Sequence, residues 1–280
     1  MKHHMTFRWL NLMFLLILLV SCAPGVCYGD NATPSGSNQI TVLDYGAIPN
    51  DGSSDSAAIN RALMNASLSG GTTVVIPSGT YDIDGPLRIF SNTSLELDHD
   101  SIMKKIPDGA PLLYVAHRDE SGEICPGDET CTHGGYTQGS NINITGGVWD
   151  MNDLAGTFDE SAIMFRHCRD IHLSDMSIKN CTNHFVNSSG VKDVSFRNVI
   201  FEDAVEYSGT DDSFWMGDKP GTTQRYDSVE ALHLDYLTKE GEPKGFPIDG
   251  TSCSGVEVTN CTFDNVFSGV GTHHVGNGKQ

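Results

Sequence analysis

Apolar residues recur in short alternating runs through the middle of the chain. Residues 171–178, 194–201 and 256–263 each carry apolar side chains at positions 1, 3, 6 and 8. Residues 142–149 match three of these positions, and residues 95–102 align with them as well. Alternation with a period of two predicts β-strands. The Asn, Asp or Gly at position 5 of the first four runs predicts a left-handed turn between two short strands.

The runs that start at Ile171 and Val194 are 23 residues apart. A unit this short cannot bury its own apolar face and must stack on copies of itself. The pattern therefore predicts an all-β solenoid, a right-handed parallel β-helix. A leucine-rich repeat has a similar length but needs an LxxLxL pattern with a helix, and a β-sandwich needs closely spaced hairpin turns. The sequence matches neither pattern.

Residues 40–81 precede the repeats and follow a different pattern. A strand from Ile40 leads to the turn at residues 50–52, after which Ser54 or Asp55 caps an amphipathic helix. The helix ends before residues 70–71, both Gly, and its apolar stripe comprises Ile59, Ala62, Leu63 and Ala66. Such a helix can close one end of a solenoid by covering its strand edges and core.

These N-terminal segments resemble a known family. The strand with Asp44-Tyr-Gly-Ala47, the Asn-Asp-Gly turn, the helix from Asp55 and the segment Gly70–Tyr81 are similar to the start of polygalacturonases (glycoside hydrolase family 28), in the pectate lyase superfamily. The resemblance covers residues 40–102 and continues as coil periodicity to about residue 275. It implies a parallel β-helix that handles an extracellular polysaccharide, and it leaves the reaction open because one fold hosts many chemistries.

The N-terminus predicts export from the cytoplasm. Lys2 and Arg8 precede the apolar stretch from Leu10 to Val20, which has the length of a signal-peptide core and is too short to span a bilayer comfortably. Two alternatives remain open: a lipoprotein signal with a lipid on Cys22, or a signal peptide cut near Gly29. We expect residues 1–28 to be the export segment, 29–39 a linker and 40–280 the β-helix domain. The protein is then secreted or on the cell surface, with membrane contact only through a lipid at Cys22.

Composition narrows the class of ligand. The chain has 17 Lys and Arg against 36 Asp and Glu, a formal charge of −19, which excludes a nucleic-acid backbone as partner unless a local basic patch exists. The 30 glycines and 19% charged residues argue against a helical bundle. The expected partner is a polysaccharide, and an anionic one would require calcium or a locally basic groove. We expect a monomer.

The cysteines divide by their surroundings. Cys125 and Cys131 lie in a Gly/Pro-rich stretch, where an exported protein would form a small disulfide loop. Four others lie in or beside strand-like runs without CxxC or His-x-His spacing, so we expect core residues and no metal site: Cys168, Cys181, Cys253 and Cys261.

Alignment of the coils by the repeat predicts a column of polar side chains on one sheet. It aligns His167, Ser188, Asp235 and His273. Within residues 230–235, Leu232 and Leu234 are expected to face the core while His233 and Asp235 project outward, so that their charges need no burial.

This column predicts the catalytic and binding residues. Hydrolysis needs one carboxylic acid at the leaving oxygen and a second carboxylate that activates water, roles we assign to Asp235 and Asp249. His273 is the third catalytic candidate. Trp215, in the repeat-breaking segment 204–252, is expected to stack on a sugar ring or to pin its loop. The remaining substrate-binding candidates are His233, His274, His167 and Arg166.

Three functions are consistent with these features. The leading hypothesis is an exported glycoside hydrolase, which requires no cofactor. The second is a polysaccharide lyase, in which a basic residue removes a proton beside a uronate, often with Ca²⁺. The third is a non-catalytic adhesin or sugar-binding β-helix. The polygalacturonase motifs have only loose counterparts here, and the ending at Gln280 without a cap leads us to expect a fragment or a short relative.

Overall fold

The computed structural model describes residues 38–107, 110–119, 121–125, 133–152, 161–205, 230–235 and 249–272. They all fall within one compact unit, Ser37–Gln280. No helix in this described part is long and apolar enough to cross a membrane. Several predictions fall outside the described residues: the export segment 1–28, most of the linker, and Cys22, Cys131, Trp215, His273 and His274.

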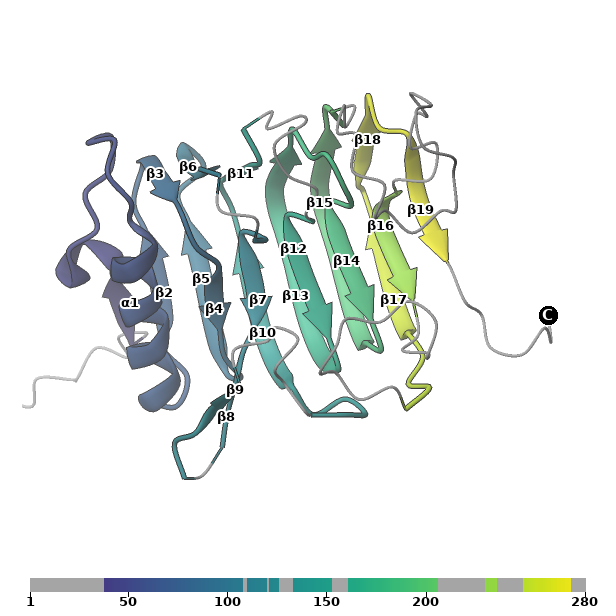
Figure 1. Cartoon of the computed structure of the whole chain (residues 1–280), viewed down its shortest axis with the longest axis horizontal. Coiled ribbons are helices and arrows are strands. Elements are labelled where there is room, and N and C mark those ends of the chain that lie inside the picture. The colour runs from purple at the N-terminus through teal and green to yellow at the C-terminus, as the bar shows by residue number, and fades with distance from the viewer. Residues whose placement is uncertain are drawn as a thin grey trace, which may run out of the picture. The chain divides into compact units, whose positions relative to one another are not determined.

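Each coil contributes strands to two parallel sheets, which run in chain order from α1 (Ser56–Leu68) to the last strand (Figure 1). We call the larger one sheet A, and its strands are β1 (Gln39–Thr41), β2 (Thr73–Ile76), β3 (Gly79–Ile83), β5 (Thr93–Leu97), β6 (Ser101–Lys105), β10 (Gly139–Thr145), β11 (Val148–Asp150), β13 (Cys168–Lys179), β15 (Lys192–Glu202), β17 (Ser254–Thr259) and β18 (Thr262–Asp264). Sheet B consists of β4 (Leu87–Ile89), β7 (Leu113–Val115), β12 (Ile163–Arg166), β14 (Val186–Ser189), β16 (Glu230–Asp235) and β19 (Ser268–Thr272). A small antiparallel pair, β8 (His117–Arg118) and β9 (Ile124–Cys125), lies beside them.

The all-parallel pairing between successive coils confirms the predicted β-helix. Connections between parallel strands of one sheet are almost always right-handed, which fits the predicted hand. Sheet B also enters the repeat-breaking segment 204–252, which contains β16, and residues 103–140 between two of the repeats, which contain β7.

The predicted register holds for four of the five runs. Ile142, Ile171, Val194 and Val256 form one column across sheet A. The alignment of Leu95 with this column is wrong, because Leu95 pairs with the residue two places later, Ile144. The reason is a turn at residues 98–100 that lengthens this coil between β5 and β6.

The turn residues have the predicted left-handed backbone. Asn198, Asn260 and Asp175 have φ values of 53°, 54° and 56° at position 5 of their coils. The Asn198 side chain also donates a hydrogen bond of 2.7 Å to Asp175 Oδ1 in the neighbouring coil. An asparagine therefore serves both the turn and the stacking of coils.

The interior between the sheets is filled by aliphatic and aromatic side chains. Phe201 lies at the centre of one cluster, edge-on to Phe185 at 6.0 Å and stacked on Phe263 at 5.1 Å between ring centroids. At the N-terminal end the core is covered by α1, whose predicted stripe is fully buried. The helix begins after Asp55, as expected, but the Asp55 carboxylate accepts a 2.8 Å hydrogen bond from Ile48 N instead of capping the helix. Burial raises the pKa of Asp55.

The cysteines follow the predicted division. Cys168 and Cys181 are buried, Cys253 and Cys261 are partly buried, and all four are free. Burial raises the pKa of the Cys168 and Cys181 thiols, which makes them unreactive core residues. Cys125 is disulfide-bonded. Its predicted partner, Cys131, lies outside the described residues, so the pairing stays a prediction.

Candidate functional site

The outer face of sheet B carries two rows of polar side chains. The first row crosses β12, β14 and β16 in register because the strands are parallel, whereas the second row has the apolar Met164 at its β12 position. Arg166, Ser189 and Asp235 form the first row. Asn187 and His233 lie in the second row, which ends at Gly271 on β19. Neighbouring residues in such a row are roughly 4.8 Å apart. Ser189, at the centre of the first row, is buried.

The predicted column was shifted by one residue on two of its strands. Asp235 pairs with Ser189 and not with Ser188, which is buried and faces the core. His167 lies one residue beyond Arg166, at a buried turn with φ of 52°. Alignment by the 23-residue repeat gave the wrong register because turns of variable length join the strands of sheet B to those of sheet A. A shift of one residue moves a side chain to the opposite face of the sheet.

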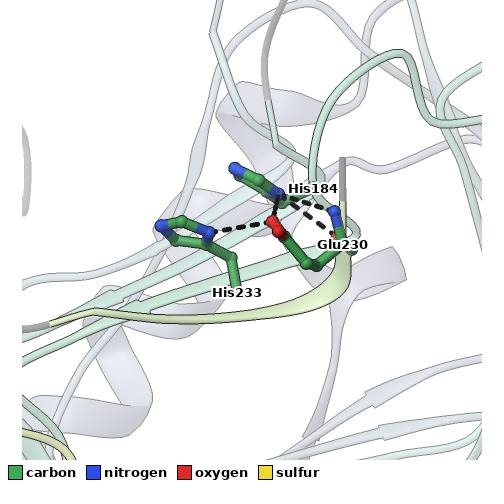
Figure 2. A group of neighbouring side chains, drawn as sticks. All are labelled: His184, Glu230 and His233. Atoms are coloured by element: carbon green, nitrogen blue, oxygen red, sulfur yellow. Dashed lines mark hydrogen bonds and ion pairs between the residues drawn. The ribbon is translucent and has the colours of Figure 1, made fainter. Parts of the chain in front are cut away.

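His184, Glu230 and His233 converge on the outer face of sheet B (Figure 2). The Nδ1 atoms of His184 and His233 lie 3.2 Å and 3.0 Å from the same carboxylate oxygen, Glu230 Oε2. The two imidazole rings stack with centroids 4.0 Å apart. Asp235 lies on the other side of His233, with Oδ2 at 3.7 Å from Nε2. His233 is therefore held between two carboxylates. We call these four residues the histidine–carboxylate cluster.

Local structure explains how Glu230 reaches this cluster. It is the first residue of β16, and its side chain passes over Gly271 of β19. A Cβ atom at Gly271 would lie 2.1 Å from Glu230 Cγ, so only glycine leaves room for this path. His184 lies two residues before β14, and its Nδ1 is 3.2 Å from the backbone oxygen of Glu230. The strand starts of β14 and β16 thus bring His184 and Glu230 together.

The cluster is largely covered although it lies on the outer face. The side chains of Glu230, His233 and Asp235 are 6%, 13% and 15% exposed. The expectation that the charges of His233 and Asp235 need no burial is therefore wrong. Burial by itself would lower the pKa of His233, but its hydrogen bonds and Coulombic contacts with Asp235 and Glu230 outweigh this and raise the pKa to about 9. These contacts therefore favour the protonated form of His233.

Asp249 lies in a different set of contacts. Its Oδ2 accepts a 2.8 Å hydrogen bond from Gly135 N, and its Oδ1 accepts from the backbone and side chain of Thr251. Burial by itself would raise the pKa of Asp249. The hydrogen bonds from Thr251 and Gly135, together with the nearby charge of His167, outweigh burial and lower the pKa below its usual value. His167 Nδ1 in turn lies 2.8 Å from Gly135 O. The same loop returns to β16, since Cys253 Sγ is 3.0 Å from the Asp235 backbone oxygen.

Sequence reasoning placed Asp235 and His233 on the outer face and named Arg166 as a binding candidate, but it missed His184 and Glu230. By strand alternation, Glu230 should face inward like Leu232, two residues later. It turns outward because it is the first residue of β16. A signal for His184 existed, because extending the β14–β16 register by two residues places it beside Glu230.

The fold and a match to a known family indicate the class of this protein. A family model described as rhamnogalacturonase A/epimerase, pectate lyase-like, matches residues 39–97. This match covers the cap and the first coils, where the resemblance was found in the sequence. The match confirms the resemblance over these residues, and the chain has a pectate-lyase-like parallel β-helix fold.

Individual relatives show similarity over much more of the chain. The plasmin and fibronectin-binding protein A of Streptococcus pneumoniae is 24% identical over 256 residues, which are 84% of this chain and 33% of that protein. The structure of the Streptococcus pneumoniae surface protein and adhesin PfbA has a TM-score of 0.65 at 22% identity, covering 86% of this chain and 58% of that one. An exopolygalacturonase from Thermotoga maritima has a TM-score of 0.55 at 16% identity, covering 85% and 55%. The chain thus spans about a third of its curated relative, and the structural similarities establish the fold.

Proposed function

We propose that this protein is an exported carbohydrate-active enzyme that binds a polysaccharide across the outer face of sheet B and hydrolyses it beside Asp235. The observation that carries the proposal is the in-register row of Arg166, Ser189 and Asp235, which meets the histidine–carboxylate cluster at β16. A polar strip that crosses successive coils fits an extended sugar chain, since each coil offers one more set of hydrogen-bonding groups.

The burial of the cluster favours an enzyme over an adhesive surface. A pair of carboxylates and two imidazoles with 6–15% exposure costs desolvation energy. Binding surfaces tolerate exposed charges and gain little from burying them. Arrangements of titratable groups that are covered and mutually perturbed are typical of catalytic sites.

In this proposal Asp235 and Asp249 are the paired carboxylates of the hydrolase. Asp235 ends β16, and the loop that carries Asp249 reaches the Asp235 backbone through Cys253 at 3.0 Å. The hydrogen bonds from Gly135 and Thr251 keep Asp249 ionised, as a water-activating carboxylate requires. Arg166 and Ser189 would contact the sugar hydroxyl or carboxylate groups. His273, which follows β19 in the sequence, remains a catalytic candidate.

The second candidate is a surface adhesin, and the similarity to plasmin and fibronectin-binding protein A favours it. That relative also supports a location at the cell surface, in agreement with the expected export segment. An adhesin would use the solenoid as a scaffold and would bind without turnover.

A polysaccharide screen distinguishes these functions. Plant, algal and bacterial polysaccharides would be incubated with the full chain, reading reducing ends and ultraviolet absorbance in parallel. We expect reducing ends without unsaturated products, and we expect Asp235→Asn to abolish them, with Asp170→Asn on sheet A as the matched control. Unsaturated ends would instead identify a lyase. Binding without any release from any glycan would favour the adhesin.

A further inference from the structure

We propose that His184, Glu230 and His233 bind one divalent transition-metal ion, with Zn²⁺ as the simplest occupant. This site goes beyond the proposed hydrolysis and does not depend on it. It was not expected from the sequence, where no metal-ligand spacing was found. The three ligand atoms are His184 Nδ1, His233 Nδ1 and a Glu230 oxygen, from a set that all lie within 4.8 Å of one another.

The spacing of the ligand atoms is close to that of a tetrahedral site. Zn²⁺ binds imidazole nitrogen and carboxylate oxygen at about 2.0–2.2 Å, so two ligand atoms on one ion lie roughly 3.3 Å apart. Both imidazole nitrogens lie near this distance from Glu230 Oε2, at 3.2 Å and 3.0 Å (Figure 2). Two imidazoles and one carboxylate are also a common ligand set for zinc and related ions.

Asp235 supplies the outer contact that metal-bound histidines commonly have. A ligating imidazole usually donates its other ring N–H to a carboxylate or carbonyl, which orients the ring. His233 has this arrangement, with Nδ1 toward Glu230 and Nε2 toward Asp235 Oδ2 at 3.7 Å. Both carboxylates contact His233, and a divalent cation beside it also offsets negative charge that is largely removed from water.

Binding requires a small movement of the rings. They are stacked with an angle of 23° between their planes, whereas a metal ion lies in the plane of each imidazole it binds. The rings must therefore tilt apart around the ion. The imidazoles are 15% and 13% exposed, so a water molecule or a sugar hydroxyl can complete the coordination.

A second group within the described residues, Asp98, His99 and Asp100, provides an internal control. These residues are consecutive and exposed, with the His99 side chain 85% exposed. Ordering such side chains around an ion costs conformational entropy that the covered cluster has already lost. We therefore assign the tight site to the cluster and none to residues 98–100.

The experiment is a metal titration of the full chain after treatment with a chelator. Zn²⁺ would be titrated by calorimetry, and Co²⁺ by its visible absorption, which reports coordination geometry. We expect one tight ion per chain and a tetrahedral Co²⁺ spectrum. His184→Asn and Glu230→Gln should each weaken binding by more than about 100-fold, and Asp235→Asn by roughly 10-fold, as expected for an outer contact. His99→Asn should leave binding unchanged.

The proposal is overturned if the wild type binds neither ion, or if His184→Asn binds as tightly as wild type, or if only His99→Asn removes the ion. Circular dichroism would show whether each variant keeps its strands. If Glu230→Gln loses them, His184→Asn decides, because its side chain comes from a different coil. Metal binding without glycan cleavage would overturn the proposed hydrolysis but not the metal site. If metal-free protein cleaves a glycan, the proposed hydrolysis is supported, and the metal site is then tested by the titration alone.

Discussion

Sheets A and B each carry a histidine beside a carboxylate on their outer face, and the two pairs have almost the same length. On sheet A, His172 Nε2 lies 3.1 Å from Asp170 Oδ1. On sheet B, His233 Nδ1 lies 3.0 Å from Glu230 Oε2. The exposure differs: the sheet A side chains are 47% and 54% exposed, and those of sheet B are 13% and 6% exposed.

This difference in burial separates a solvated surface from a site. An exposed ion pair contributes about 0–1 kcal/mol because water screens it. Removing one partner of a buried pair costs about 3–5 kcal/mol because the other charge is left uncompensated. Residue types and distances alone therefore do not mark function in this fold. Burial by the surroundings is what distinguishes the candidate site on sheet B.

The largest expected effect concerns the core that both faces share. Phe201→Ala removes the ring that contacts Phe185 and Phe263, and Phe185 directly follows His184. We expect a loss of about 3–5 kcal/mol in the free energy of unfolding, measured by denaturant titration. Phe267→Ala, at an exposed position, is the control and should cost far less. Equal losses of unfolding free energy in Phe201→Ala and Phe267→Ala would contradict a shared core beneath sheets A and B.

The pH dependence of stability tests the burial of the sheet B pair. In chelator-treated protein, the pKa of His233 rises from 6.5 to about 9 on folding, because Glu230 and Asp235 hold its proton against the cost of burial. The resulting stabilisation is fully present below about pH 6.5 and is lost as pH rises toward 9. It amounts to about 3 kcal/mol.

Two variants isolate this contribution. The difference in unfolding free energy between wild type and His233→Gln should shrink from pH 6.5 to pH 9, whereas the difference for His172→Gln on sheet A should stay small and flat. If the His233→Gln difference is also flat, the sheet B pair behaves as a surface pair, and the comparison of the two faces fails.

A smaller effect is expected where β19 makes room for Glu230. In Gly271→Ala the new Cβ would lie 2.1 Å from Glu230 Cγ and would displace this side chain from the histidines. We expect a loss of about 1–3 kcal/mol, as for other overpacked sites. Gly269→Ala is a matched control on the same strand, because its Cβ would meet the Phe263 ring at an ordinary 3.5 Å. Thermal unfolding of both variants measures the difference, and equal melting temperatures would contradict the close approach.

The smallest effect concerns a turn of sheet A. Asn198 has a φ of 53° and donates a hydrogen bond to Asp175. Asn198→Ala should cost about 1–2 kcal/mol, because alanine disfavours the left-handed region. Asn198→Gly should cost less, since glycine adopts that conformation freely. Both variants lose the hydrogen bond to Asp175, so a glycine variant that is less stable than the alanine variant would contradict the left-handed backbone as the cause.

The register of the strands was predicted correctly within the regular repeats and less well outside them. The sheet A columns through Ile171 and Val194 were predicted because period, turn residue and apolar face agree there. Leu95 was misaligned because a longer turn adds residues within its coil. Ser188 and His167 were misplaced because sheet B strands are only three to six residues long and offer little pattern to set the register.

The candidate site was predicted only in part. His233 and Asp235 were placed on the outer face by alternation within β16, and Arg166 was chosen from β12, two coils away. Glu230 was passed over because its parity points inward, and His184 because it precedes its strand. Both depend on contacts between coils that are 46 residues apart in the sequence.

By itself the sequence determined the solenoid, its cap and its left-handed turns, because these arise from local periodicity and from interactions that each coil repeats. The tertiary structure decided which charges are covered. Coil stacking set the register of β14, β16 and β19, and this register brought His184, Glu230, His233 and Gly271 together. Burial depends on neighbours from other coils, and local pattern does not encode those neighbours once the repeat is interrupted.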